Sequence, residues 1–179
     1  PALSRDGRLG PMNAIELAHL LDLAPHPEGG YFRETYRSEE TLARGALPGR
    51  FAGDRVFGTS IYFLLTEGTF SALHTIESDE LWHHYDGGAL RIVTLDEHGA
   101  REDFVLGKDY ARGERPFAWV PRGRVFGSHV EPGVPHALVG CTVAPGFDFA
   151  DFRMPSRHEL LARYPEHEAV VTRLTRSSP

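Results

Sequence analysis

His74 and Glu80 are the two side chains of this chain whose types and spacing could do acid–base chemistry. They lie in the stretch 68–88, GTFSALHTIESDELWHHYDGG, on either side of a break between two strand-like runs. A histidine can accept a proton near neutral pH, and a carboxylate beside it orients the ring and raises its basicity. The pair is therefore predicted to be a catalytic base and its orienting group.

The residues around His74 predict an apolar pocket. Every second side chain of a β-strand points to the same side, so His74 shares its face with Phe70, Ala72 and Ile76. Glu80 comes from the next strand and is expected to approach His74 on that face. Hydrocarbon walls with one imidazole and one carboxylate favour a small-molecule ligand.

Several nearby side chains are further candidates for this pocket. Tyr85 could supply a proton to the oxygen of an enolate. Strand alternation from Glu80 favours His84 as the neighbouring histidine that faces the pocket. The glycines of the segment 26–30, HPEGG, predict a turn that folds over the mouth. The other expected ligand-binding residues are Tyr31, Arg33, Phe126 and Ser128.

A succession of short strand-like runs must position these residues. From residue 59 onward, runs rich in β-branched and aromatic residues recur about every 8–12 residues, with glycine or proline between them. This rhythm predicts an antiparallel sandwich or barrel, and the lack of strand–helix alternation argues against a Rossmann-type fold. The predicted strands are 59–66, 70–76, 80–86, 90–96, 101–107, 117–123, 124–130, 137–145 and 147–154.

Capping patterns predict helices near both ends of the chain. Asn13 with Glu16 forms a capping box for a helix over 13–23, which the following prolines end. Ser156 with Glu159 repeats the pattern before a C-terminal helical region. Residues 42–54, which lack a clear period, are expected to form a surface loop.

Length and composition limit the function. A chain of 179 residues suits one domain, predicted over 13–175 after a flexible segment over 1–12. A net charge of −6 and the lack of an apolar run of ~20 residues argue against nucleic-acid and membrane partners. Cys141 is the only cysteine, so a disulfide within the chain is impossible and we expect a cytoplasmic protein.

The stretch around His74 resembles the first motif of the cupin superfamily, in which a glycine, an H-x-H pair, a glutamate and a second glycine recur. Ile76 replaces the second histidine of the pair, and Phe126 replaces the histidine of the second motif. Only two of the four metal ligands implied by the resemblance remain, and catalytic metal sites usually keep three. We therefore expect no cofactor; a bound metal would have His74 and Glu80 as its ligands. The matched positions of the first motif are Gly68, His74, Glu80 and Gly87.

A longer set of strings is similar to the DUF985, or cupin-5, family. The resemblance implies an all-β double-stranded β-helix, the cupin jelly-roll barrel, with a short N-terminal helix and C-terminal helices, often as a homodimer. The family pattern W-H-x-Y favours His83, not His84, as the histidine in the pocket. The strings are HPEGGYFRETYRS (26–38), SIYFLL (60–65), SDELWHHYDGGAL (78–90), RIVTLDEHG (91–99), VPRGRVFGS (120–128) and LVGCTVAPGFDFADFRM (138–154).

Three functions are compatible with these residues. The first is a metal-independent epimerase or isomerase of a sugar-like or nucleotide-sugar-like ligand, with His74 as base, Glu80 as its orienter and Tyr85 or a residue at the mouth as acid. The family's label as predicted sugar epimerases agrees with it by fold analogy. The second is a non-catalytic small-molecule binding protein, and the third is a metal-dependent oxygenase or isomerase with an irregular ligand set.

Overall fold

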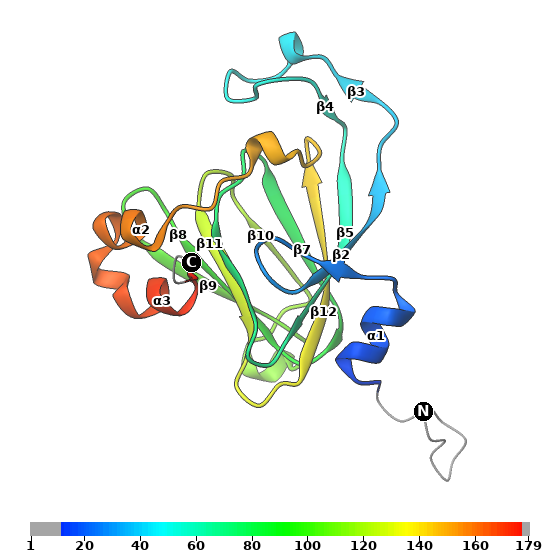
Figure 1. The fold of residues 1–179 in the computed structure, drawn as a ribbon, viewed down its shortest axis with the longest axis vertical. Coiled ribbons are helices and arrows are strands. Elements are labelled where there is room, and N and C mark those ends of the chain that lie inside the picture. Colours follow the sequence, from blue (N-terminus) through cyan, green and yellow to red (C-terminus); the bar gives the residue numbers. More distant parts are fainter. Residues whose placement is uncertain (1–11, 177–179) are drawn as a thin grey trace.

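Two antiparallel β-sheets form a barrel (Figure 1). The structure is a computed structural model that describes residues 12–176. The larger sheet has the order β1-β2-β5-β12-β7-β10, and the smaller has the order β6-β11-β8-β9. The larger sheet contains β1 Ala24–Pro25, β2 Tyr31–Arg37, β5 Thr59–Thr66, β7 Asp79–Gly87, β10 Phe117–Val120 and β12 His136–Ala144. The smaller sheet contains β6 Phe70–His74, β8 Leu90–Leu95, β9 Arg101–Leu106 and β11 Val125–Val130.

The all-β jelly-roll barrel predicted from the sequence is confirmed. Most of the predicted runs are strands, and the inward side chains of both sheets meet in one apolar core. The core follows from the alternation along each strand, because antiparallel strands bury one face and leave the other to solvent. Its largest buried members include Trp82, Phe63, Phe126, Leu65 and Ile92.

Strand β6, which carries His74, lies at an edge of the smaller sheet. It pairs with β11, where His74 stands opposite Phe126 and a β-bulge follows. Three backbone N–H groups along this edge donate to segments outside the sheets, and these segments fix the position of β6. The bonds run from Ala72 to the carbonyl of Glu28 (2.8 Å), from Leu73 to that of Leu174 (2.9 Å) and from Thr75 to that of Arg153 (2.8 Å).

The first helix, α1 (Ala14–Leu20), begins at the predicted cap. Asn13 accepts a hydrogen bond from the backbone N–H of Glu16, whose side chain accepts one from Asn13. The helix is shorter than the predicted span of 13–23. The predicted flexible segment 1–12 lies outside the described residues except for residue 12.

The C-terminal helices cover the smaller sheet (Figure 1). Helix α2 (Arg157–Arg163) begins at the predicted cap Ser156, and α3 (Glu168–Arg173) follows after the 3-10 turn η4 (Pro165–His167). A second apolar cluster joins them to the sheet, whereas α1 packs on the larger sheet, where Leu17 meets Leu64 and Leu138. Its buried members include Leu160, Tyr164, Val171 and Leu174 from the helical region and Leu73, Val93 and Leu95 from the sheet.

An arm formed by residues 38–58 extends beyond one end of the barrel (Figure 1). It contains the short strands β3 (Thr41–Leu42) and β4 (Arg55–Val56), which pair with each other, and the 3-10 turn η1 (Arg44–Ala46) between them. Arg55 donates two hydrogen bonds, of 2.6 and 2.5 Å, to the Asp151 carboxylate, and both side chains are buried. This ion pair anchors the arm to the chain that follows β12.

The segment 147–154 differs from its prediction. Its alternating sequence FDFADFRM predicts a strand, but the chain forms the 3-10 turn η3 (Phe149–Asp151) instead. Asp148 accepts a hydrogen bond from the backbone N–H of Ala150 (2.8 Å), which starts the turn. The predicted strand is therefore wrong, because local capping and the ion pair to the arm outweigh the period-two pattern.

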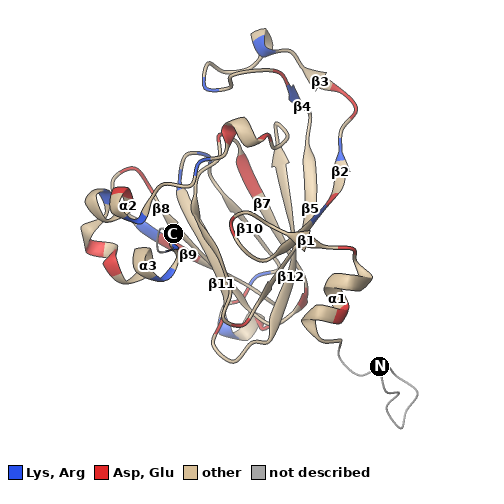
Figure 2. Ribbon diagram, viewed as in Figure 1, with Lys and Arg blue, Asp and Glu red and all other residues tan. Residues whose placement is uncertain are grey.

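Charged residues of both signs are spread over the ribbon (Figure 2). Among residues 12–176, no helix is long and apolar enough to span a bilayer. A further 3-10 turn, η2 (Tyr110–Arg112), lies between β9 and β10.

Candidate functional site

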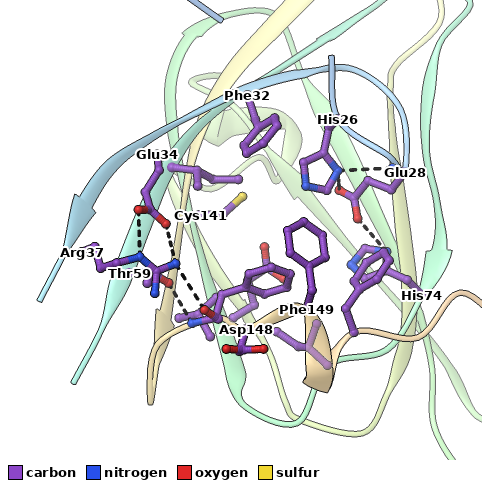
Figure 3. Close-up of a pocket in the computed structure, with 16 residues that line it drawn as sticks. His26, Glu28, Phe32, Glu34, Arg37, Thr59, His74, Cys141, Asp148 and Phe149 are labelled. Atoms are coloured by element: carbon purple, nitrogen blue, oxygen red, sulfur yellow. Dashed lines mark hydrogen bonds and ion pairs between the residues drawn. The ribbon is translucent and has the colours of Figure 1, made fainter. Parts of the chain in front are cut away.

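A cavity of about 230 Å³ lies between the barrel, the 26–30 loop and the η3 segment (Figure 3). His74 and Glu80 both line it, as do Ile76 and Cys141. The two principal candidates of the sequence therefore meet in one mostly apolar cavity. The other lining residues are His26, Glu28, Phe32, Glu34, Arg37, Thr59, Ile61, Val143, Phe147, Asp148, Phe149 and Phe152.

The His74 ring is held in one tautomer by the backbone. Its Nδ1 lies 2.7 Å from the carbonyl oxygen of Ala72, and a carbonyl can only accept a hydrogen bond, so Nδ1 carries the proton. Nε2 of the neutral ring is then a free base, and it has no hydrogen-bond partner among the described residues. Burial lowers the pKa of His74, which keeps the ring neutral.

Glu80 enters the cavity from β7, on the same face as Trp82. Its side chain is 8% exposed, and no nitrogen or hydroxyl donor among the described residues bonds to its carboxylate. Burial raises the pKa of Glu80 to about 7, while the neighbouring His74 lowers it and Glu28 raises it. A carboxyl that titrates near neutral pH can both give and take a proton.

The 26–30 loop adds two titratable groups, His26 and Glu28, that are not among the residues predicted for the site. Glu28 Oε2 lies 3.1 Å from His74 Nδ1, and Glu28 Oε1 lies 3.7 Å from His26 Nδ1 (Figure 3). Burial raises the pKa of Glu28 to about 8 and lowers that of His26 to about 4. At neutral pH these two residues therefore remain mostly uncharged.

Glu28, not Glu80, orients His74. The predicted orienter Glu80 influences the imidazole through charge, but the contact with Nδ1 comes from Glu28 and the Ala72 carbonyl. The reason is topological, because the 26–30 loop crosses the edge of β6 and hydrogen-bonds to Ala72. The turn predicted at the mouth indicated that the 26–30 loop lies near the site. The sequence spacing alone could not show which side chains of this loop point inward.

The mouth of the cavity is aromatic. Phe147, Phe149 and Phe152 form a cluster with ring centroids 5.1–6.1 Å apart and interplanar angles of 69–80°. Beside them, Arg37 donates two hydrogen bonds to Glu34, at 2.9 and 2.7 Å (Figure 3). The mispredicted strand 147–154 thus supplies much of the wall.

Tyr85 does not line the cavity. Its ring packs against Tyr62 on the outer face of the larger sheet, with centroids 5.9 Å apart, and is 44% exposed. Strand alternation explains the placement, because Glu80 and His84 point inward and Tyr85 follows directly after His84. The predicted role of Tyr85 as acid is therefore corrected.

Tyr31 and Arg33 also lie outside the cavity. In β2 the inward positions are those of Phe32 and Glu34, which line it. Tyr31 lies against the α1 region, and the Arg33 guanidinium stands 5.7 Å from the centre of the Tyr62 ring. The sequence already indicated this placement, because the apolar Phe32, which lies between Tyr31 and Arg33, is the residue expected to face the interior.

The two histidines of β7 point to opposite sides, and neither lines the cavity. His83 lies outside, with its ring centroid 5.3 Å from that of Phe117. His84 is buried inside, as alternation predicts, but its Nε2 bonds to the carbonyl of Gly88 (2.9 Å), away from the cavity. The ligand-binding role predicted for either histidine is not supported by these positions.

Phe126 and Ser128 are core residues behind the cavity. The Phe126 ring lies 4.1 Å from the His74 ring, so it backs the imidazole without reaching the cavity. Ser128 is fully buried opposite Ser71 on β6. Phe126 can therefore influence a ligand only through His74.

Comparison with known proteins identifies the family. Residues 15–155 match the family Cupin_5, described as cupin superfamily (DUF985). The chain belongs to the Cupin_5 family. An uncharacterized protein of Saccharomyces cerevisiae is 31% identical over 150 residues, which are 79% of this chain and 74% of that protein.

Solved structures agree with this membership. A protein from Shewanella oneidensis is 41% identical with a TM-score of 0.83, over 93% of this chain and 99% of its own. A hypothetical protein from Leishmania major is 31% identical with a TM-score of 0.85, over 93% of this chain and 100% of its own. Oxalate decarboxylase from Bacillus subtilis is 16% identical with a TM-score of 0.51, over 86% of this chain and 37% of its own, which shows the fold alone.

The side chains of this Cupin_5 protein do not supply the metal-ligand set of other cupins. Ile76 lines the cavity where a second histidine would stand, and the Phe126 ring packs on His74 where a third would stand. Among residues 12–176, no three His, Cys, Asp or Glu side chains are arranged to hold a metal ion.

Replacing Glu28 by Gln is expected to change how stability depends on pH. Because burial raises the pKa of Glu28 to about 8, the folded protein keeps a proton that the unfolded chain loses at a lower pH. This contribution to wild-type stability is complete at acidic pH and is lost as the pH rises to about 8. Glu28→Gln cannot ionise, so its free energy of unfolding relative to wild type should rise by up to about 1.4 kcal/mol per pH unit.

Chemical denaturation between about pH 5 and pH 9 measures this difference. Glu97→Gln is the matched control, because the Glu97 side chain is 76% exposed. A Glu28→Gln profile that runs parallel to the wild-type profile would contradict the assignment of Glu28 as a buried, protonated acid.

Proposed function

We propose that this Cupin_5 protein binds a small carbonyl compound in the cavity and moves a proton at the carbon next to its carbonyl group, as an epimerase or isomerase does. The observation that carries the proposal is that the free Nε2 of His74 and the carboxyl of Glu80 line one mostly apolar cavity. Exclusion of water strengthens the electrostatic interactions of both groups with a bound ligand.

The geometry supports one assignment of roles. His74 Nε2 removes the proton from carbon, and the electron pair of the broken C–H bond forms the enolate. Glu80, which is partly protonated near neutral pH, gives its proton to the enolate oxygen. In an isomerisation, the Glu80 carboxylate then takes the proton of the neighbouring hydroxyl group, and the protonated His74 gives its proton to the carbon of the former carbonyl, so the carbonyl group moves by one carbon. The Ala72 carbonyl, with the Glu28 carboxyl beside it, holds the imidazole at Nδ1, so these two groups replace Glu80 as the orienter, and Glu80 replaces Tyr85 as the acid.

The size of the cavity narrows the ligand. Sites for drug-sized molecules usually have volumes of about 300–1,000 Å³, and this cavity has about 230 Å³. Such a space suits one molecule of the size of a monosaccharide. The nucleotide of a nucleotide-sugar would have to remain outside the aromatic mouth.

Deuterium exchange tests the proposal. The protein would be incubated in D2O with a panel of monosaccharides, amino sugars and small ketones, and recovered material would be examined by NMR for deuterium at the carbon next to the carbonyl. Exchange that needs the protein supports the proposal. A compound that binds and is recovered without deuterium would favour the alternative of a non-catalytic binding protein.

We also propose that the outer face of the larger sheet mediates a homodimer. Exposed aromatic side chains gather there on neighbouring strands, with Trp119 52%, Phe117 43% and Tyr85 44% exposed. Aromatic residues are enriched in protein interfaces, and such a face can pair with its own copy.

Trp119→Glu is expected to weaken the dimer by at least about tenfold, because a charge replaces an apolar anchor. Native mass spectrometry over a dilution series measures the change. Tyr110→Glu is the control, since Tyr110 is an exposed aromatic residue of η2. A monomeric wild-type protein at high concentration would refute the dimer.

A further inference from the structure

More carboxyl groups than guanidinium or ammonium groups line the cavity. Four carboxyls, those of Glu28, Glu34, Glu80 and Asp148, face one guanidinium, that of Arg37. Arg37 is occupied by its two hydrogen bonds to Glu34. Among the described residues that line the cavity, no other Lys or Arg is present to receive an anionic ligand.

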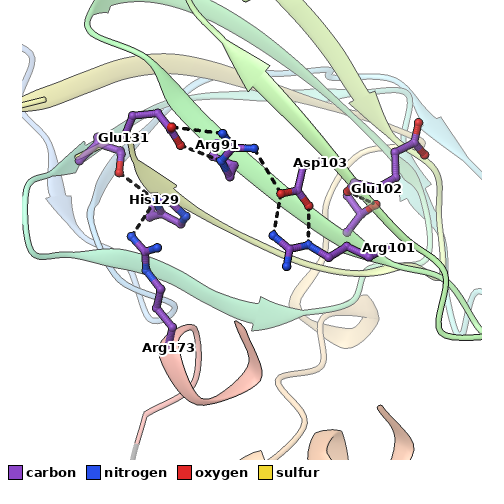
Figure 4. A network of polar contacts seen from close by, with 9 residues as sticks. Arg91, Arg101, Glu102, Asp103, His129, Glu131 and Arg173 are labelled. Carbon is purple, nitrogen blue, oxygen red and sulfur yellow. Dashed lines mark hydrogen bonds and ion pairs between the residues drawn. The ribbon is translucent and has the colours of Figure 1, made fainter. Parts of the chain in front are cut away.

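A second cluster of polar side chains contains carboxylates that are each paired with an arginine, and it can be compared with the cavity. On the outer face of the smaller sheet, Arg91 donates to Glu131 (2.7 Å) and Asp103 (3.3 Å), and Arg101 donates twice to Asp103 (2.8 and 2.7 Å) (Figure 4). Each of these carboxylates thus has a basic partner. Glu80 has none of this kind in the cavity, although it is more deeply buried.

Two hydrogen-bond acceptors of buried side chains line the cavity without a nitrogen or hydroxyl donor among the described residues. The Glu80 carboxyl lacks a nitrogen or hydroxyl donor among residues 12–176, and so does Nε2 of His74. Both side chains are more than nine-tenths buried. The side-chain donor recorded for Glu80 is the Cys141 thiol, which is a weak donor. Because both acceptors line the cavity, they suit a ligand that brings N–H or O–H groups.

The aromatic walls favour a positive charge on that ligand. The faces of aromatic rings are electron-rich and attract a cation within about 6 Å of the ring centre. Phe32 and the cluster of Phe147, Phe149 and Phe152 all line the cavity. Because the rings of the cluster stand at 69–80° to one another, they present faces in several directions.

From the acidic lining, the unpaired acceptors and the aromatic walls, we infer that the ligand is a small organic cation carrying an ammonium group. This inference rests on the proposed function only in that the ligand occupies the same cavity. The ammonium N–H groups donate to Glu80, and the rings surround the attached carbon atoms. A phosphorylated or carboxylated compound is disfavoured, because Arg37 is the one Lys or Arg among the described residues that line the cavity and it is already paired with Glu34.

Binding of a cation should release protons. The groups that face Glu80 are the His74 imidazole, the Glu28 carboxyl and the Cys141 thiol, and Arg176 lies near Glu28 without lining the cavity. An ammonium ion stabilises the ionised carboxylate, so Glu80 loses its proton when the ligand enters. Affinity should therefore increase as the pH rises from about 6 to about 8.

Three probes of one shape test the inference: tert-butylammonium, tert-butanol and pivalate carry the same apolar group with positive, zero and negative charge. Amide chemical-shift titrations at neutral pH would measure their affinities. We expect tert-butylammonium to bind at least about tenfold more tightly than tert-butanol, and pivalate to bind weakest. Glu80→Gln should reduce the affinity for tert-butylammonium about tenfold, whereas Glu97→Gln, on an exposed side chain, should not.

The outcomes separate this inference from the proposed proton transfer. Tighter binding of tert-butanol or pivalate, or no shift of cavity signals with any probe, would overturn the cationic ligand. If the cationic ligand is refuted in this way, deuterium exchange on an uncharged carbonyl compound would still support the proposed proton transfer. A clear preference for tert-butylammonium without exchange on any amine-bearing carbonyl compound would support the cationic ligand and refute the proton transfer.

Discussion

His74→Gln is expected to lower the rate of deuterium exchange by about 10²–10⁴-fold, the usual contribution of a positioned general base. Gln retains a side-chain amide that can still bond to the Ala72 carbonyl, but it has no basic nitrogen at the position of Nε2. Ligand binding should change far less than the rate, because the apolar walls remain. NMR measurement of exchange and of ligand affinity on the same samples checks both parts.

Two variants control this result. His98→Gln makes the same chemical change at a side chain that is 81% exposed, and it should leave exchange unchanged. Tyr85→Phe should also retain exchange, since the Tyr85 ring lies on the outer face. A His74→Gln protein that exchanges at the wild-type rate would remove His74 from the mechanism, and a large loss in Tyr85→Phe would contradict the assignment of Glu80 as acid.

Arg55→Ala is expected to destabilise the folded protein by roughly 3 kcal/mol. The Arg55 and Asp151 side chains are 4% and 5% exposed, so the substitution leaves a covered carboxylate without its partner. The loss includes packing, because the guanidinium also lies 5.6 Å from the centre of the buried Phe51 ring. Chemical denaturation measures the change in the free energy of unfolding.

The matched control is Arg153→Ala. Arg153 pairs with Glu159, but these side chains are 68% and 49% exposed, so the expected loss is below about 1 kcal/mol. The double variant Arg55→Met with Asp151→Leu should recover most of the stability, because neither charge then remains. Equal losses for the two Arg→Ala variants would show that the Arg55 pair is not effectively buried.

The barrel could be predicted because the features that determine its strands lie in short, continuous stretches of the sequence. Turn residues and alternating apolar positions recur along the chain, and each strand carries its own pattern. His74 and Glu80 were found for the same reason, since both lie in one continuous stretch of sequence. Tyr85 was misassigned although alternation from Glu80 places it outside the barrel.

The rest of the site depends on contacts between distant segments. His26 and Glu28 reach His74 because the loop is pressed against β6, so closely that a Cβ on Gly29 would lie 2.1 Å from the Phe70 carbonyl oxygen. No local pattern reports such a contact. The aromatic mouth was hidden in the same way, because the period-two sequence of 147–154 is typical of a strand and only the arm and the Asp148 cap identify a turn.

The covering of β6 by non-strand segments has a consequence for solubility during folding and storage. An outermost strand with free N–H groups is a template on which another chain can add, and this is how many β-proteins begin to aggregate. Here the carbonyls of Glu28, Leu174 and Arg153 occupy those donors. The strand that carries His74 is thereby closed to strand addition by a neighbouring molecule.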